Sequence, residues 1–125
     1  MGLDMFAYST TKKPVKSVDF TVPSDQCEEI FYWRKHPNLH GWMQELYFQK
    51  GGKDESFNCA CLKLTMKDLN FLEKAIREKQ LPHTEGIFFG SDDNSNEEMK
   101  NDLKFIKKAK SEILKGKTIF YSSWW

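Results

Sequence analysis

The spacing of hydrophobic residues changes several times along this chain, and these changes constrain the fold more than any other feature of the sequence. Apolar residues at every second position are typical of half-buried β-strands, and apolar residues at every third or fourth position are typical of amphipathic helices. Both patterns occur in irregular order within 125 residues, a length that supports one hydrophobic core. We therefore expect a single compact domain over residues 1–125, of the α+β class, with a mixed or antiparallel sheet and about three helices.

Strand-like segments are those with period-two alternation or a short apolar run. They cover residues 3–9, 15–22, 28–35, 57–64, 86–90 and 117–125. Segment 28–35 is also compatible with a short helix opened by Ser24, and its aromatic residues favour the strand. In the last segment, Tyr121 falls on one face of the expected strand and Trp124 on the other.

Three segments have the pattern of helices. The first covers residues 37–49, with a proline in its first turn, and the second follows a Thr65 cap and ends before residues 81–82. The third begins with a capping box of Ser95 and Glu98 and ends at a glycine, residue 116.

The charge balance argues against a global attraction to polyanions. Nineteen Lys and Arg residues oppose eighteen Asp and Glu residues, which gives a formal net charge of +1. We expect neither a membrane nor duplex nucleic acid as a partner, and any anion site has to be local. Aromatic residues make up 14% of the chain and supply large surfaces for burial or for a ligand.

The cysteine content predicts a reducing compartment. Cys27, Cys59 and Cys61 cannot form a closed disulfide framework, and no basic and apolar leader precedes them. We therefore expect a cytoplasmic protein whose fold needs no disulfide. Cys59 and Cys61 are expected to be buried thiols on one side of a strand.

The sequence gives no reason to expect a metal or another cofactor. His36, His40 and His83, together with the cysteines, match no established spacing of zinc ligands. Segment 90–95 is acidic, but it lacks the alternating oxygen ligands of an EF-hand and is better explained as a turn and a helix cap.

Unusual residues cluster in segment 32–42, where a strand is expected to enter a helix. A helix start presents backbone amides to anions, Arg and Lys side chains add positive charge, and Trp rings stack on bases. The pattern predicts a site for an anionic, nucleotide-like ligand. Its candidate ligand-binding residues are Trp33, Arg34, Lys35, His40, Trp42, Tyr121 and Trp124. In the alternative interpretation, the tryptophans pack in the core and the cations are solvated.

Several motifs resemble a family of small phage and prophage proteins whose members are sometimes labelled phosphoglycerate kinase. The motifs are MGLDMF at the start, YWRK at 32–35, LHGW at 39–42, GIFFGS at 86–91 and YSSW at 121–124. The kinase label does not fit a chain of this length without a phosphate loop. The resemblance spans nearly the whole chain and implies a phage accessory protein in the host cytoplasm. It marks Trp33, Arg34, His40, Trp42 and Trp124 as positions to examine and supplies no catalytic residue.

Three hypotheses about function follow. The first is a nonenzymatic nucleotide-binding protein that sequesters a host immune signal, with Arg34, Lys35 and His40 on phosphate and a tryptophan on the base. The second is an inhibitor that docks on a host defence protein through exposed aromatics such as Trp124 and Trp125. The third is a small hydrolase, which is the weakest because His40 has no identifiable catalytic partner. The sequence leaves open whether the protein forms a homo-oligomer.

Overall fold

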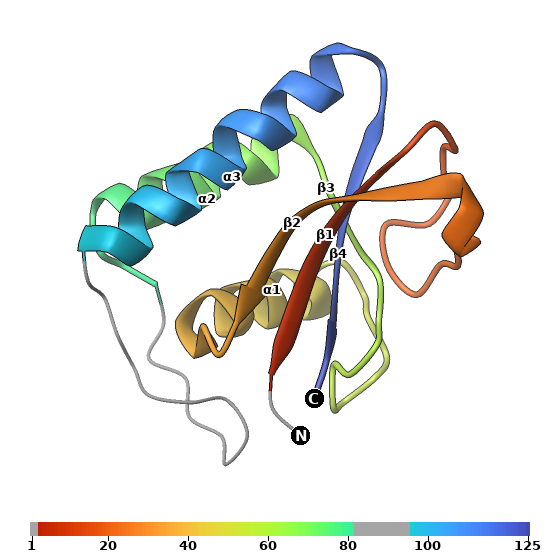
Figure 1. Ribbon diagram of the computed structural model, residues 1–125. Helices are drawn as coiled ribbons and strands as arrows, with labels where there is room; N and C mark the ends of the chain where they lie inside the picture. The colour runs from red at the N-terminus through yellow and green to blue at the C-terminus, as the bar shows by residue number, and fades with distance from the viewer. Residues whose placement is uncertain (1–2, 82–95) are drawn as a thin grey trace.

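The computed structural model describes residues 3–81 and 96–125. Over these residues the chain forms a four-stranded antiparallel sheet in the order β2-β1-β4-β3 (Figure 1). The strands are β1 (Asp4–Thr10), β2 (Cys27–Arg34), β3 (Leu62–Leu64) and β4 (Thr118–Trp124). The central strands β1 and β4 pair along their whole lengths, so the first and last described strands lie side by side.

The helices all lie on one side of the sheet (Figure 1). They are α1 (Pro37–Gln49), α2 (Met66–Arg77) and α3 (Asn96–Leu114), and a 3₁₀ turn, η1 (Ser24–Gln26), precedes β2. Helices α2 and α3 pack against each other, and α1 crosses below the sheet. This arrangement confirms the expected α+β class. Among the helices of the described residues, none has the length and apolar character needed to cross a membrane.

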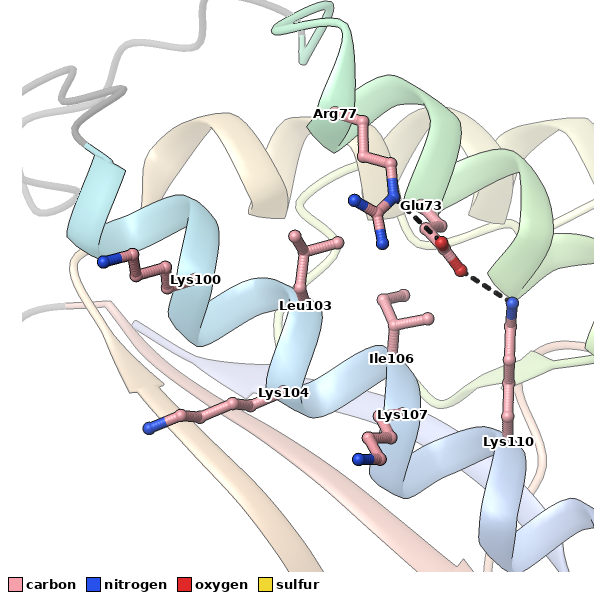
Figure 2. Close-up of a pocket in the computed structure, with 8 residues that line it drawn as sticks. All are labelled: Glu73, Arg77, Lys100, Leu103, Lys104, Ile106, Lys107 and Lys110. Carbon is pink, nitrogen blue, oxygen red and sulfur yellow. Dashed lines mark hydrogen bonds and ion pairs between the residues drawn. The ribbon is translucent and has the colours of Figure 1, made fainter.

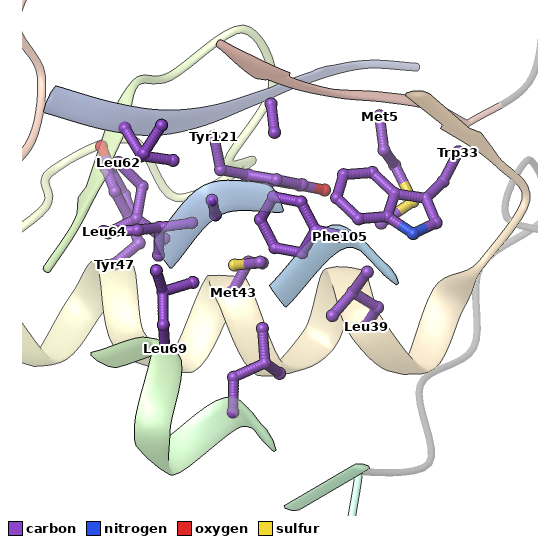
Figure 3. Packing of buried hydrophobic residues seen from close by; sticks show 14 of the residues in the cluster. Met5, Trp33, Leu39, Met43, Tyr47, Leu62, Leu64, Leu69, Phe105 and Tyr121 are labelled. Carbon is purple, nitrogen blue, oxygen red and sulfur yellow. The ribbon is translucent and has the colours of Figure 1, made fainter. Parts of the chain in front are cut away.

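The core lies between the sheet and the helices. Figure 3 shows Met5, Trp33 and Tyr121 pointing from the strands toward Met43 of α1 and Phe105 of α3. All of these side chains are buried. Burying one large apolar side chain contributes about 1.5–3 kcal/mol, so this layer is the main source of stability.

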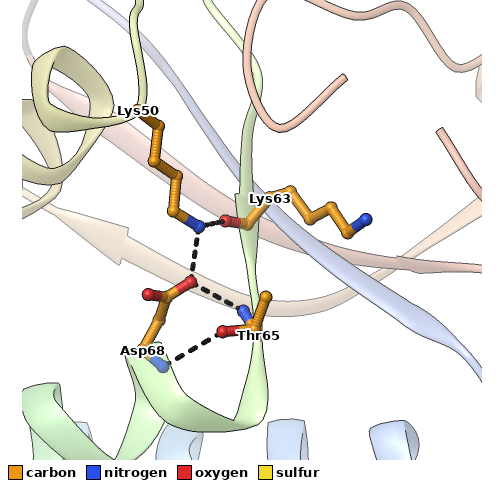
Figure 4. Close-up of polar contacts among 4 residues, drawn as sticks. All are labelled: Lys50, Lys63, Thr65 and Asp68. Atoms are coloured by element: carbon orange, nitrogen blue, oxygen red, sulfur yellow. Dashed lines mark hydrogen bonds and ion pairs between the residues drawn. The ribbon is translucent and has the colours of Figure 1, made fainter. Parts of the chain in front are cut away.

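The start of α2 is fixed by the expected Thr65 cap (Figure 4). The Asp68 backbone N–H donates to Thr65 Oγ1 at 3.2 Å, and the Thr65 N–H donates to Asp68 Oδ2 at 2.9 Å. Lys50, which follows α1, donates to the same carboxylate oxygen at 2.5 Å and to the Lys63 carbonyl at 2.7 Å. One lysine therefore ties the end of α1 to β3 and α2.

Segment 15–22 does not form the expected strand. Within the described residues its pairing is limited to an isolated bridge between Val18 and Leu62 at the edge of β3. Asp19 has a φ of 56°, which ends the extended geometry, and Val15 is fully exposed. The alternating pattern was misleading because, within residues 3–81 and 96–125, no full-length strand pairs with this segment.

Strand β3 is shorter than the expected strand over residues 57–64. Phe57 and Cys59 have φ values of 48° and 63°, so they leave the β region, and regular pairing begins at Leu62. Cys59 is exposed and Cys61 is half-buried, which corrects the expectation of two buried thiols. The expected strand over 86–90 and the Ser95 cap lie outside the described residues.

Candidate functional site

The junction between β2 and α1 sends its side chains to two opposite faces of the sheet. Because side chains alternate along a strand, Trp33 points toward the helices, whereas Tyr32 and Arg34 point away from them. Trp33 is 4% exposed and Tyr32 is 44% exposed. The cluster that the sequence singles out is thus divided into an inner, buried group and an outer, exposed group.

In the inner group, His36 joins the junction to α3. Its Nδ1 lies 2.5 Å from Oε1 of Glu98, and its Nε2 lies 2.8 Å from Oδ2 of Asp102. The Trp33 Nε1–H donates to the other oxygen of Asp102 at 3.1 Å. His36 and Asp102 are both buried. The contacts of His36 with both carboxylates, together with the Trp33 bond to Asp102, hold the junction on α3.

His40 lies one helical turn after His36 and faces β4. Its Nδ1 is 2.7 Å from the Tyr121 hydroxyl, and its ring stacks on Phe57 with centroids 5.1 Å apart. Burial lowers the pKa of His40 from 6.5 to about 4. The imidazole is therefore neutral at pH 7 and supplies no positive charge, so we place no phosphate contact on His40.

The outer face of the sheet carries aromatic rings that none of the helices in the described residues covers. The aromatic ladder consists, in order, of Tyr32, Phe6, Tyr8, Phe120 and Phe20. Neighbouring ring centroids lie 5.3, 6.0, 5.1 and 5.5 Å apart in that order. Phe20 packs edge-on against Phe120, which is 3% exposed. Ring surface is thus accessible at the Tyr32 end of the ladder.

A row of charged and aromatic residues crosses three strands beside the accessible end of the ladder. Asp4 of β1 pairs with Arg34 of β2 on one side and with Trp124 of β4 on the other. The Tyr32 hydroxyl donates to Asp4 Oδ1 at 2.5 Å, and Trp124 is 66% exposed. Lys35, also exposed, directly follows Arg34. We call this surface the open face and define it by Asp4, Phe6, Tyr32, Arg34 and Trp124.

The seven residues expected to bind a ligand do not gather in one place. Trp33, His40 and Tyr121 are buried on the inner side, and Trp42 packs partly buried against the core. Arg34, Lys35 and Trp124 are exposed, and Arg34 and Trp124 both flank Asp4 on the open face. The alternation of side chains across the sheet accounts for this division.

Sequence reasoning missed the carboxylates of the inner group and the rings of the open face. Glu98 and Asp102 are four residues apart on α3, a spacing that places both on one helix face and could have indicated a pair. Phe6 and Tyr8 share the Asp4 side of the alternating first strand. That this side is left without a helix could not be read from the alternation.

The described residues contain no group of three or more His, Cys, Asp or Glu side chains placed to hold a metal ion. The three cysteines are free thiols, and burial raises the pKa of Cys61 to about 11. Cys61 is therefore a protonated thiol at neutral pH, which makes it a weak nucleophile.

Comparisons of the chain with protein-family models, with curated proteins and with solved structures find no match. The resemblance to small phage proteins therefore stays a prediction, and the site has to be interpreted from its own chemistry.

Proposed function

We propose that the protein binds an anionic, nucleotide-like ligand on the open face and holds it without converting it. The observation that carries this proposal is the row of Arg34, Asp4 and Trp124 beside the accessible end of the aromatic ladder. Exposed rings on a four-stranded antiparallel sheet are a platform on which bases stack in other proteins.

The dimensions of the row suit a single nucleotide. Adjacent strands lie about 4.8 Å apart, so the backbones of Arg34 and Trp124, two strands apart, are separated by about 10 Å. A base stacked on Trp124 or Tyr32 can then direct its phosphate toward Arg34 and Lys35. The Asp4 carboxylate lies between them and is an acceptor for an amino or hydroxyl group of the ligand. It disfavours a phosphate placed centrally.

Sequestration is favoured over turnover by what the open face carries. His36 and His40 lie on the inner side, so no histidine of the described chain is available there as a general base. If the phage resemblance holds, retention of a nucleotide signal made by a host defence system is the corresponding biological role.

Calorimetry with a panel of cyclic and linear nucleotides tests the proposal. Replacing Arg34 by Ala should weaken binding by about 1.5–3 kcal/mol, the range of a charge-assisted hydrogen bond. Replacing Trp124 by Ala should cost about 1–3 kcal/mol, the value of a base–aromatic stack. The matched control is Phe71→Ala, because Phe71 is 58% exposed on α2, away from the open face.

Nucleotides should be recovered intact after incubation, as judged by chromatography. Absence of binding across the panel, or equal losses in the Arg34, Trp124 and Phe71 variants, would contradict the proposal.

A second candidate function is docking on a host defence protein. Glu28 and Glu29 are exposed at the start of the edge strand β2, at the opposite end from Arg34, so acidic as well as basic residues border the aromatic ladder. An aromatic surface bordered by both charge signs is typical of a protein interface. Binding of a purified partner that survives saturating nucleotide and is lost in the Trp124→Ala variant would favour this function.

A further inference from the structure

A groove on the helical side of the molecule lies opposite the open face. It has a volume of about 580 Å³ and runs between α2 and α3 (Figure 2). Its described lining residues are Glu73, Arg77, Lys100, Leu103, Lys104, Ile106, Lys107 and Lys110. Five of these eight side chains carry positive charge and one carries negative charge.

The single carboxylate of the groove is already paired. Lys110 Nζ donates to Glu73 Oε1 at 2.7 Å, and Arg77 Nε donates to Glu73 Oε2 at 3.0 Å. These two donors hold the pKa of Glu73 below its ordinary value. Figure 2 shows both cations turned toward Glu73, so the carboxylate offsets one of the two positive charges at this end of the groove.

The three remaining lysines of the groove are available to pair with the carboxylates of a partner. Lys100, Lys104 and Lys107 form no ion pair with another described residue, and Figure 2 shows Lys104 directed away from Glu73. Their spacing of four and three residues places them on one face of α3, about 6 and 4.5 Å apart along the axis. The partly buried Leu103 forms the apolar floor between this row and α2, and Ile106, 2% exposed, lies beneath it in the core.

We propose that this groove binds an acidic amphipathic helix of a partner protein. Apolar side chains of such a helix pack on Leu103 and on the alkyl stems of the lysines, and Asp or Glu side chains at the same helical spacing pair with Lys100, Lys104 and Lys107. Charge complementarity with this lysine row selects the acidic partner. None of the described residues that line the groove is aromatic, so these residues offer no stacking surface of the kind that single-stranded nucleic acid requires.

The test measures fluorescence anisotropy of a labelled amphipathic peptide of about 18 residues, or five helical turns, with Leu on one face and Glu beside it. The full-length protein should bind this peptide. Replacing every Glu of the peptide by Gln should weaken binding about tenfold, and so should the triple variant Lys100→Gln, Lys104→Gln, Lys107→Gln.

The matched control is the triple variant Lys12→Gln, Lys13→Gln, Lys16→Gln, which changes net charge equally at exposed positions outside the groove. It should bind the peptide like the wild type. Failure of the wild type to bind, or equal losses in the two triple variants, would overturn the proposal. Tighter, groove-dependent binding of oligothymidine or of anionic phosphatidylserine vesicles would also overturn it.

This inference does not depend on the proposed function. The Lys100, Lys104 and Lys107 variant should keep nucleotide binding, and Arg34→Ala should keep peptide binding, so failure of one proposal is distinguishable from failure of the other.

Discussion

At the scale of single residues, the turn between β2 and α1 is held in an unfavourable backbone conformation. Lys35 has a φ of 54°, in the left-handed region that disfavours side chains with a Cβ. Its N–H donates to the Leu3 carbonyl at 2.9 Å, and the next residue, His36, is anchored by Asp102 and Glu98. These contacts hold Lys35 in the left-handed conformation despite its cost. They thereby fix the backbone that follows Arg34 at the end of β2.

Glycine at position 35 should relieve this strain. We expect Lys35→Gly to raise the free energy of unfolding by about 0.5–1 kcal/mol, because the penalty of a left-handed residue outweighs the extra freedom of glycine in the unfolded chain. Lys35→Ala keeps the Cβ and should give no such gain. Urea denaturation with unchanged m-values measures both. A glycine variant less stable than the alanine variant would show that Lys35 contributes more than backbone strain.

The buried His40 should make stability depend on pH. The pKa of His40 is about 4 in the folded protein and near 6.5 when exposed, so the unfolded chain takes up the proton first as pH falls. The stabilisation is fully present above pH 6.5 and is lost as pH falls toward 4. The pKa difference corresponds to about 3 kcal/mol.

His40→Gln keeps a polar partner for Tyr121 and removes the titration. The fall in unfolding free energy between pH 7 and pH 4 should therefore be about 3 kcal/mol smaller in this variant than in the wild type. Urea unfolding at a series of pH values gives the comparison. Parallel curves for the two proteins would mean that His40 titrates normally in the folded state.

Among the helices and strands, three are joined by the contacts of one residue, Lys50, with a carboxylate and a backbone carbonyl. Asp68 completes the cap of α2 and receives Lys50 from the end of α1, while Lys50 also donates to β3. The Thr65 hydroxyl, by contrast, has one described contact, which is its cap bond with the Asp68 N–H. The two residues therefore differ in how many elements depend on them.

Alanine variants at the α2 cap should show this difference. Thr65→Ala should lower the free energy of unfolding by about 1 kcal/mol, the usual cost of a lost N-cap. Asp68→Ala should cost about 2–3 kcal/mol, because a charge-assisted bond is lost and Lys50 keeps one partner fewer. Equal losses in thermal and urea unfolding would show that the Lys50 contact contributes nothing.

Elements whose boundaries are set by local chemistry were predictable from the sequence. The Thr65 cap, Pro37 in the first turn of α1, and the glycine after α3 each mark a helix end, and all three helices form near the expected residues. The prediction of a strand over residues 15–22 was wrong because alternation alone does not supply a neighbouring strand. The Asp102 contacts could not be predicted, since Trp33 and His36 are 69 and 66 residues away in sequence.

At the scale of the whole molecule, the placement of all helices on one side of the sheet decides which residues are available. The sequence predicts that Tyr121 and Trp124 point to opposite faces of the last strand, and the structure bears this out. Which face the helices cover depends on packing of the entire chain. That packing leaves the open face and the groove between α2 and α3 on opposite sides of the molecule.

In the proposed function, a nucleotide-like ligand contacts the outer side of the β2–α1 junction and leaves the inner side untouched. The chain has four tryptophans, and Trp33 and Trp124 are 4% and 66% exposed, so their indole N–H signals report the two sides separately. The most direct test is a ¹H–¹⁵N NMR titration of the full-length protein with the tightest-binding nucleotide of the panel. We expect the Trp124 indole signal to shift with saturation while the Trp33 and Trp42 signals stay in place. Shifts of Trp33 or Trp42 with an unmoved Trp124 would contradict this expectation.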